Sequence, residues 1–356
     1  DLLEAACIPG GQQLVLKLLD IDSIKISLED KAAGVLEKAY ENKMGDVVLK
    51  LFGLASVQEE VTARDNYALR WACFNKMQKV AHKLLDFPSV RESAAVNDNE
   101  AFMFACQSGM EEVALDLLTL KCVQEKAEVK DNFALGKACE NKMEGLAHKL
   151  LAIKAVKNDA AAWGNAAFRW ACQNQMEDVA YKLLALNCVK PNVAAEENEA
   201  LRWVCHNNMK DLAIDLLAFE SVQENAAAED NEALRLACKN NMQDVALRLL
   251  EYKCVQDNAA YCSNYAIGWA CLNKMESVAF NLLKFQCVKD KAAVEDNAVL
   301  RYACRGNMQG IVHELLEIES VRANAAARDN EVFRSACENN INDLALKLFE
   351  LESVQE

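Results

Sequence analysis

The same sequence pattern returns along this chain every 33 residues, and from Thr62 onward no copy gains or loses a residue. Residues 230–250, DNEALRLACKNNMQDVALRLL, are a clear example. A fixed period between about 20 and 50 residues is typical of stacked supersecondary units, each too small to bury a core without its neighbours. The period therefore predicts a solenoid of about eleven repeats, the first and last of them incomplete.

A cysteine and an asparagine hold fixed positions in the repeat. The cysteines are Cys7, Cys73, Cys106, Cys139, Cys172, Cys205, Cys238, Cys271, Cys304 and Cys337, with Tyr40 between the first two. The asparagines are Asn66, Asn99, Asn132, Asn165, Asn198, Asn231, Asn264, Asn297 and Asn330. Helices pack about 8–10 Å apart, whereas a disulfide needs Cα atoms within about 7 Å. We therefore expect free thiols and a reducing compartment, the cytosol of the protein's own cell or of a host.

The repetition shows no domain boundary. Residues 1–60 hold two atypical N-terminal copies and residues 61–356 hold the regular ones, so we expect one continuous solenoid domain. The chain begins in an apolar stretch and stops midway through a repeat, which is typical of a fragment of a longer protein. No apolar run approaches the roughly 18 residues that span a bilayer, so we expect a soluble protein with no membrane partner.

Each copy has the apolar spacing of two antiparallel helices, so the predicted fold class is all-α. In residues 230–250, apolar residues at i, i+1, i+4 and i+5 form the face of a first helix, which Asp230 or Asn231 is expected to cap. Asn241 follows at a turn. Because the same position is a glycine at Gly109, we expect a left-handed residue there. A second apolar face then predicts the second helix.

The last third of each copy predicts a short third helix. Ser221 and Glu224 have the spacing of a capping box, and the alanines that follow offer no β-branched alternation for a hairpin. The serine position holds a cysteine in four other copies, and we expect those cysteines to be small buried residues. They are Cys122, Cys188, Cys254 and Cys287.

The 33-residue period, the helix–turn–helix content and the Ala-Cys and Leu-Leu pairs resemble the ankyrin-repeat family along essentially the whole chain. That family's T-P-L-H-x-A-A opening is similar to Glu232-Ala-Leu-Arg-Leu-Ala-Cys238, and its N-G-H turn is similar to Asn240-Asn241-Met242. The family's glycine-rich hairpin is replaced by strings such as Lys253-Cys-Val-Gln-Asp257, so we expect short helices in place of β-fingers. Copies of the form D-N-E-A-L-R-x-A resemble divergent repeats in effectors of intracellular bacteria. The resemblance implies protein binding without catalysis.

An arginine position on the first helix raises the question of nucleic-acid binding. The arginines lie one residue before a largely aromatic position, and some RNA-binding solenoids read one base per repeat with such side chains. The net charge of −15, however, repels phosphates. We expect the arginines to bridge neighbouring copies to carboxylates, with the aromatics in the seams and no nucleic-acid partner. The arginines are Arg70, Arg169, Arg202, Arg235, Arg301 and Arg334.

The cysteines and histidines do not form a catalytic or metal-binding pattern. Cys205 and His206 are adjacent and therefore point in different directions on a helix. His82, His148 and His313 share one repeat position, so whole copies separate them. No C-x-x-C pair offers a zinc site. We expect a protein that is not an enzyme, without a metal or a cofactor.

Repeat proteins bind partners through the positions that vary between copies. Variable first-helix positions and copy junctions carry aromatic or leucine side chains, which are either interface anchors or scattered apolar residues in the seams. The partner-binding candidates are Tyr67, Phe74, Phe133, Trp163, Tyr261, Tyr265 and Leu272.

Two functions follow from these expectations. The first is a cytosolic protein-interaction scaffold, or the binding module of a secreted effector, that presents an acidic surface to a protein with a basic or mixed surface. The alternative is a structural protein, whose apolar chain ends stack end to end into a filament.

Overall fold

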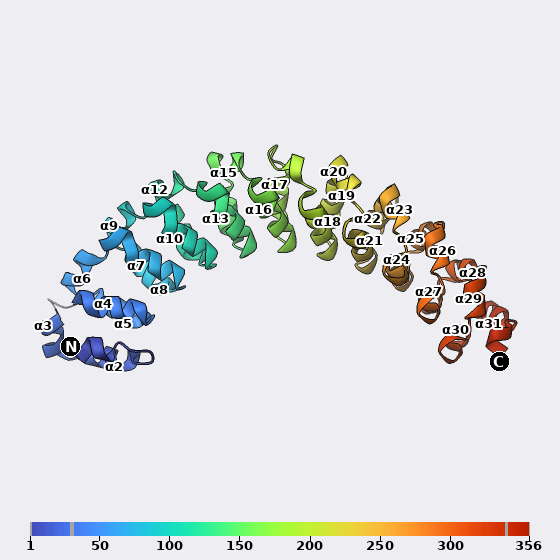
Figure 1. Ribbon diagram of the computed structural model, residues 1–356, viewed down its shortest axis with the longest axis horizontal. Helices are drawn as coiled ribbons and strands as arrows, with labels where there is room; N and C mark the ends of the chain where they lie inside the picture. Colours follow the sequence, from blue (N-terminus) through green and yellow to red (C-terminus); the bar gives the residue numbers. More distant parts are fainter. Residues whose placement is uncertain (1, 29–31, 339–340, 356) are drawn as a thin grey trace. The chain divides into compact units, whose positions relative to one another are not determined.

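The computed structural model describes residues 2–28, 32–338 and 341–355, and these residues contain helices and no strand (Figure 1). The helices form two compact units, Asp1–Cys188 and Val189–Glu356. Within each unit, successive first helices pack side by side, and each contacts the second helix of its own copy. The predicted all-α repeat fold is confirmed, whereas one continuous domain stays a prediction. Among the described helices, none combines the length and hydropathy needed to cross a bilayer.

The first unit begins with two atypical copies and continues with regular ones. The atypical copies contain α1 (Leu2–Ala6), α2 (Gln12–Leu18), α3 (Asp22–Leu28), α4 (Ala32–Glu41), α5 (Gly45–Leu51) and α6 (Ala55–Glu60). The regular first helices are α7 (Ala63–Phe74), α10 (Val96–Gln107), α13 (Val129–Glu140) and α16 (Ala162–Gln173). The second helices are α8 (Gln78–Leu85), α11 (Glu111–Leu118), α14 (Glu144–Leu150) and α17 (Glu177–Leu184). The short third helices are α9 (Pro88–Glu92), α12 (Lys121–Gln124) and α15 (Lys154–Asn158).

The second unit opens on the 3₁₀ helix η1 (Lys190–Asn192) and repeats the same order. Its first helices are α18 (Ala195–His206), α21 (Ala228–Lys239), α24 (Tyr261–Leu272), α27 (Val294–Arg305) and α30 (Ala327–Glu338). Its second helices are α19 (Lys210–Leu216), α22 (Gln243–Leu249), α25 (Glu276–Leu282), α28 (Gln309–Leu316) and α31 (Asn342–Phe349). Its short third helices are α20 (Glu220–Glu224), α23 (Lys253–Asp257), α26 (Gln286–Asp290), α29 (Glu319–Ala323) and α32 (Glu352–Gln355).

The interior is built from the predicted apolar positions. In α21, Ala233, Leu234, Ala237 and Cys238 are each at most 1% exposed. The cysteines of the described residues are free, and burial raises the pKa of thiols such as Cys238 well above its usual range. A neutral buried thiol acts as a small apolar group, which is why cysteine suits this position.

Each regular first helix opens with three residues in left-handed conformation. In α21 these are Glu229, Asp230 and Asn231, with φ of 49°, 59° and 60°, and the right-handed helix begins only after them. The same three positions have positive φ in every regular copy, from Arg64 to Asn330. This backbone costs a non-glycine residue about 1–2 kcal/mol, so other contacts must offset it. The left-handed residue predicted at Asn241 is also present, with φ of 54°.

The asparagine that ends the left-handed turn joins its first helix to a short third helix. Asn231 is 1% exposed, and its Nδ2 donates to the carbonyl oxygen of Val255 in α23 at 2.8 Å. Asn231 does not act as the predicted N-terminal cap, because its Oδ1, which would accept the bond, has no hydrogen-bond partner. Equivalent bonds join Asn66 to Val90, Asn99 to Val123, Asn132 to Val156, Asn198 to Val222, Asn264 to Val288, Asn297 to Val321 and Asn330 to Val354.

The predicted short third helix is present, but its predicted cap is wrong. In the copy of α20, the helix starts at Glu220 after an extended Phe219, so Ser221 lies inside it and caps nothing. Gln223 instead donates from Nε2 to the carbonyl oxygen of Leu217 at 2.9 Å, which caps the end of the preceding helix α19. A side-chain amide at this position thus joins the third helix to the second.

The cysteine at the serine position bridges two copies. Cys254 is only half-buried, and its Sγ donates to the carbonyl oxygen of Gln223 in the copy before it, at 3.6 Å. Ser353 makes the same contact, from its Oγ to the carbonyl oxygen of Arg322 at 3.1 Å. The expectation of a purely buried small residue is therefore wrong, since both side chains donate a hydrogen bond.

Candidate partner-binding site

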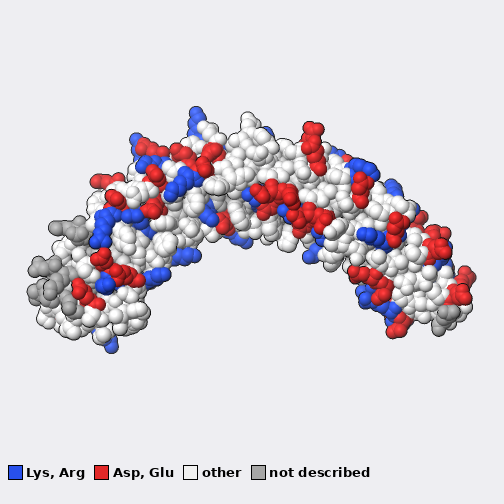
Figure 2. Space-filling view, viewed as in Figure 1, with Lys and Arg blue, Asp and Glu red and all other residues white. Residues whose placement is uncertain are grey.

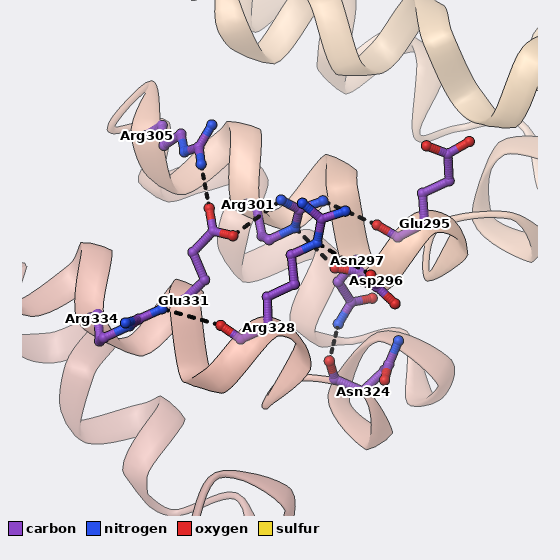
Figure 3. Close-up of polar contacts among 9 residues, drawn as sticks. All are labelled: Glu295, Asp296, Asn297, Arg301, Arg305, Asn324, Arg328, Glu331 and Arg334. Carbon is purple, nitrogen blue, oxygen red and sulfur yellow. Dashed lines mark hydrogen bonds and ion pairs between the residues drawn. The ribbon is translucent and has the colours of Figure 1, made fainter.

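In most regular copies, an arginine on the first helix bonds to the left-handed turn. Figure 3 shows Arg301, whose Nε donates to the carbonyl oxygen of Asp296 at 3.0 Å and whose Nη2 donates to that of Glu295 at 3.1 Å. Arg235 makes the same two bonds, to Asp230 and Glu229, at 3.2 Å each. In these copies two N–H groups of one guanidinium donate to adjacent carbonyl oxygens and help to offset the cost of the left-handed backbone. The turn also forms without an arginine, at residues 97–99, 130–132 and 262–264.

The same arginines bridge neighbouring copies, as the sequence predicts. Arg301 Nη1 lies 3.1 Å from a carboxylate oxygen of Glu331, thirty residues further along. Although partial burial raises it, the charges of Arg301 and Arg305 lower the pKa of Glu331 below its ordinary value. Arg202 pairs with Glu232 at 2.9 Å in the same way. These arginines therefore form ion pairs between neighbouring copies of the same chain.

Glycine replaces the arginine once in each unit, and a cavity opens at both places. The cavity beside Gly136 has a volume of about 240 Å³, and the one beside Gly268 has a volume of about 220 Å³. A Cβ added to Gly136 would have no atom within 4 Å, whereas one added to Gly268 would lie 3.4 Å from the ring of Tyr302. The cavity at Gly136 is therefore open where the arginine side chain would lie.

The Gly136 cavity lies between the first helices α13 and α16, and aromatic rings line it. Two of them, Phe133 and Trp163, are predicted partner-binding residues, and the third is Trp170. Trp163 is 69% exposed although it belongs to the left-handed turn. Asp131 and Glu140 add carboxylates to the lining. The structure thus brings two predicted candidates together around one opening.

One positive charge already lies at this opening. Lys137 forms an ion pair with Glu140, and its Nζ lies 5.6 Å from the centre of the Phe133 ring. This contact shows that an aromatic ring on this surface attracts a cation. Asp131, in the left-handed turn, keeps its side chain exposed to solvent.

Tyr67 and Phe74 lie on one helix but not in one site. Tyr67 lines a smaller cavity of about 90 Å³ with Tyr40, and the two rings meet edge to face at 5.9 Å. Phe74 does not line that cavity, and its ring contacts Phe104 of the next copy at 5.2 Å. Phe74 is nevertheless 59% exposed. Each of these two residues therefore contacts a ring of a neighbouring copy and is also exposed to solvent.

The remaining candidates lie in the second unit. Tyr265 and Leu272 line the Gly268 cavity together. Tyr261 is 40% exposed, and a hydrogen bond with the Asp230 carboxylate raises the pKa of its hydroxyl. Tyr261 does not line the Gly268 cavity, so only Tyr265 and Leu272 share a cavity.

The sequence carries a signal for both cavities, but the predicted partner-binding residues do not include the positions that carry it. Where the first helix has arginine, the residue thirty positions later is often a glutamate, as in Arg70 with Glu100. Where it has Gly136 or Gly268, that later residue is Ala166 or Ala298, and both alanines line the cavities. The loss of the arginine and its carboxylate together thus accompanies both cavities. Another cavity, of about 250 Å³ between α18 and α21, retains Arg202 and Glu232 in its lining.

The fold places the adjacent Cys205 and His206 in different surroundings. Burial raises the pKa of the Cys205 thiol to about 12, while His206 is exposed and packs on the ring of Trp203. Elsewhere, Glu144, His148 and Asp178 bring ligand atoms within 4.8 Å of one another. Lys182 lies 3.0 Å from Nδ1 of His148 and supplies a positive charge to that exposed cluster.

Acidic and basic side chains lie close together on the face drawn in Figure 2. In the second unit the left-handed turns carry exposed pairs of acids, namely Glu196 with Glu197, Glu229 with Asp230 and Glu295 with Asp296. A partner that contacts these turns would meet negative charge.

No protein-family model matches the sequence, and a search of curated proteins found none that is similar.

Proposed function

We propose that this chain is a protein-binding repeat scaffold, whose partner contacts the first helices and their left-handed turns. The observation that carries this proposal is the Gly136 cavity, where Phe133, Trp163 and Trp170 form an aromatic opening between two helices. Aromatic side chains in a pocket are typical anchors of protein interfaces, because they bury a large area at little entropic cost.

The composition and the sequence resemblance support the same function. A net charge of −15 and the acidic turns favour a partner with a basic or mixed surface. The similarity to ankyrin repeats implies protein binding, and the divergent copies imply an effector's binding module in a reducing cytosol. A scaffold of this kind needs no catalytic group or cofactor.

The experiment compares proteins captured by the immobilised chain and by two double variants. Phe133→Ala with Trp163→Ala removes two anchors, and each anchor residue contributes about 2 kcal/mol or more to binding. We expect the affinity for the captured partner to fall at least about 30-fold. Leu346→Ala with Phe349→Ala is the matched control, since both side chains are exposed on α31 in the other unit. Equal loss of binding in both variants, or no loss in the first, would refute the proposal.

The filament is the second candidate function, and it has a separate test. End-to-end assembly of a non-closing contact grows with concentration. Light scattering of the full chain across a hundredfold concentration range therefore separates the two functions. A constant particle mass excludes the filament and leaves the scaffold.

A further inference from the structure

We infer that the Gly136 cavity receives the guanidinium group of an arginine side chain from the partner protein. The inference rests on the proposed function and names the chemistry of the partner at this site. It is carried by a comparison within the chain, because other copies show the same position occupied.

In other copies, an arginine of the chain itself occupies the position that we assign to the partner's arginine. Arg235 donates to the carbonyl oxygens of the residues five and six positions before it, Asp230 and Glu229. Arg301 does the same in the next copy but one. The left-handed turn therefore forms a pair of carbonyl acceptors that a guanidinium group fits, because its planar fork donates along two parallel directions.

At α13 the acceptors are present and the side chain is missing. The left-handed turn is formed by residues 130–132, with φ of 53°, 55° and 55°. The residues five and six positions before Gly136 are Asp131 and Lys130, which correspond to the two acceptor residues of the other copies. Of these two, Asp131 lines the cavity. Gly136 has no side chain to donate to them, and a Cβ built there meets no atom within 4 Å. A guanidinium group from outside can therefore enter.

The lining suits a guanidinium group in two further ways. Arginine stacks on aromatic faces, and a cation within about 6 Å of a ring centre is attracted by it. The rings of Phe133, Trp163 and Trp170 provide such faces. Asp131 and Glu140 provide negative charge, and the ion pair of Glu140 with Lys137 leaves Asp131 to balance an added cation.

The Gly268 cavity is the internal comparison, and we expect it to bind no arginine. There the ring of Tyr302 would be in van der Waals contact with an added Cβ, at 3.4 Å, so the space beside the glycine is narrower than at Gly136. The guanidinium of Arg235 already lies 5.9 Å from the centre of the Tyr265 ring in the same lining. The second cavity is thus narrower at its glycine, and a guanidinium group already lies near its ring, whereas the cation at the Gly136 cavity is a lysine paired with Glu140.

The test titrates the full chain with the peptide acetyl-Gly-Gly-Arg-Gly-Gly-amide and follows the indole N–H signals of tryptophan by NMR. We expect saturable shifts of the Trp163 and Trp170 signals. The peptide with citrulline in place of arginine lacks the charge, and the peptide with lysine lacks the fork. Both should bind at least tenfold more weakly. Equal binding of the lysine peptide would overturn the inference, because it would show a general cation site.

A glycine-to-arginine variant gives the second measurement. Gly136→Arg supplies the guanidinium within the chain, so we expect the shifts to disappear and the thermal midpoint to rise. Gly268→Arg is the matched control, and we expect it to retain peptide binding, since it lies in the other unit and leaves the lining of the Gly136 cavity unchanged. Peptide binding that survives in Gly136→Arg would also overturn the inference.

The two proposals fail in different ways. A captured protein partner that binds equally to wild type and Gly136→Arg, with no peptide binding at all, would refute the arginine site and leave the scaffold function. Binding of the arginine peptide without any partner that depends on Phe133 and Trp163 would refute the scaffold function and leave the site.

Discussion

Asn231 and Val255 are 24 residues apart in the chain, yet the side-chain amide of the first donates to the carbonyl oxygen of the second at 2.8 Å. The asparagine meets three demands at once. It accepts a φ of 60°, it fits a buried site, and it carries a donor at the end of a short side chain. This combination explains why the position holds asparagine in every regular copy.

Asn231→Ala should lower the free energy of unfolding by about 2–4 kcal/mol, because it removes a buried hydrogen bond and places alanine in a left-handed conformation. Urea denaturation followed by circular dichroism measures the loss. Asn225→Ala is the control, since Asn225 is exposed and its side-chain amide donates to the carbonyl oxygen of the nearby Ser221. A change below about 0.5 kcal/mol for Asn231→Ala, the size of an ordinary surface effect, would contradict this role.

The left-handed turn predicts an unusual response to glycine. Glu229 is exposed with φ of 49°, so Glu229→Gly relieves backbone strain and should keep or raise stability, by up to about 1 kcal/mol. Glu229→Val should lower it by about 1–2 kcal/mol, because a β-branched residue is strained there. The control Asp244→Gly in the right-handed α22 should have the opposite sign to Glu229→Gly. Thermal unfolding compares the variants, and a loss of stability in Glu229→Gly would show that no strain is present.

The left-handed turn also marks the limit of the sequence prediction. The period and the apolar faces were sufficient for the two main helices, because burial on one side of a helix leaves a repeating pattern. Glu229, Asp230 and Asn231 leave no such pattern: nothing in three polar residues distinguishes a capped helix from a left-handed turn stabilised by Arg235. The arginine contact does not decide between them by itself, because the same turn forms at residues 130–132, where Gly136 replaces the arginine.

The candidate site was predicted in part for the same reason. Phe133 and Trp163 were found as exposed aromatics at variable positions, and they do meet. The cavity between them depends on what is missing at Gly136. The aromatic side chains in the sequence therefore predict residues around the opening of the cavity, but not the missing side chain at its centre.

The ion pair of Glu331 predicts a pH dependence. Arg301 and Arg305 lower the pKa of this carboxyl in the folded chain, so its contribution to stability is present above the unfolded-state pKa and is lost as the pH falls through the folded value. Glu331→Gln should lower stability at pH 7 and flatten the loss of stability between about pH 5 and pH 3. Urea denaturation at several pH values, with the exposed Glu314→Gln as control, measures this. Parallel pH curves for Glu331→Gln and wild type would contradict the prediction.

The buried thiols predict selective chemical reactivity. Thiolates react and thiols do not, and burial raises the pKa of Cys73, Cys139, Cys271 and Cys304 to about 12. At pH 8 these residues should resist iodoacetamide in the folded chain, while the exposed Cys262 and Cys337 are modified. Mass spectrometry of tryptic peptides gives the order of labelling. Labelling of Cys271 as fast as Cys262 would show that its helix opens under native conditions.

The bond from Asn231 to Val255, the pair of Arg202 with Glu232 and the contact of Cys254 with Gln223 all span fixed sequence offsets within or between neighbouring copies. Removing residues 232–264 would therefore give Asn231 a new partner of the same kind, Val288, at the same offset. Such a chain can grow or shrink by duplication or loss of 33-residue segments at the level of the gene. The length of the protein is then free to change in whole increments while the asparagine bonds that join the helices of each copy are kept.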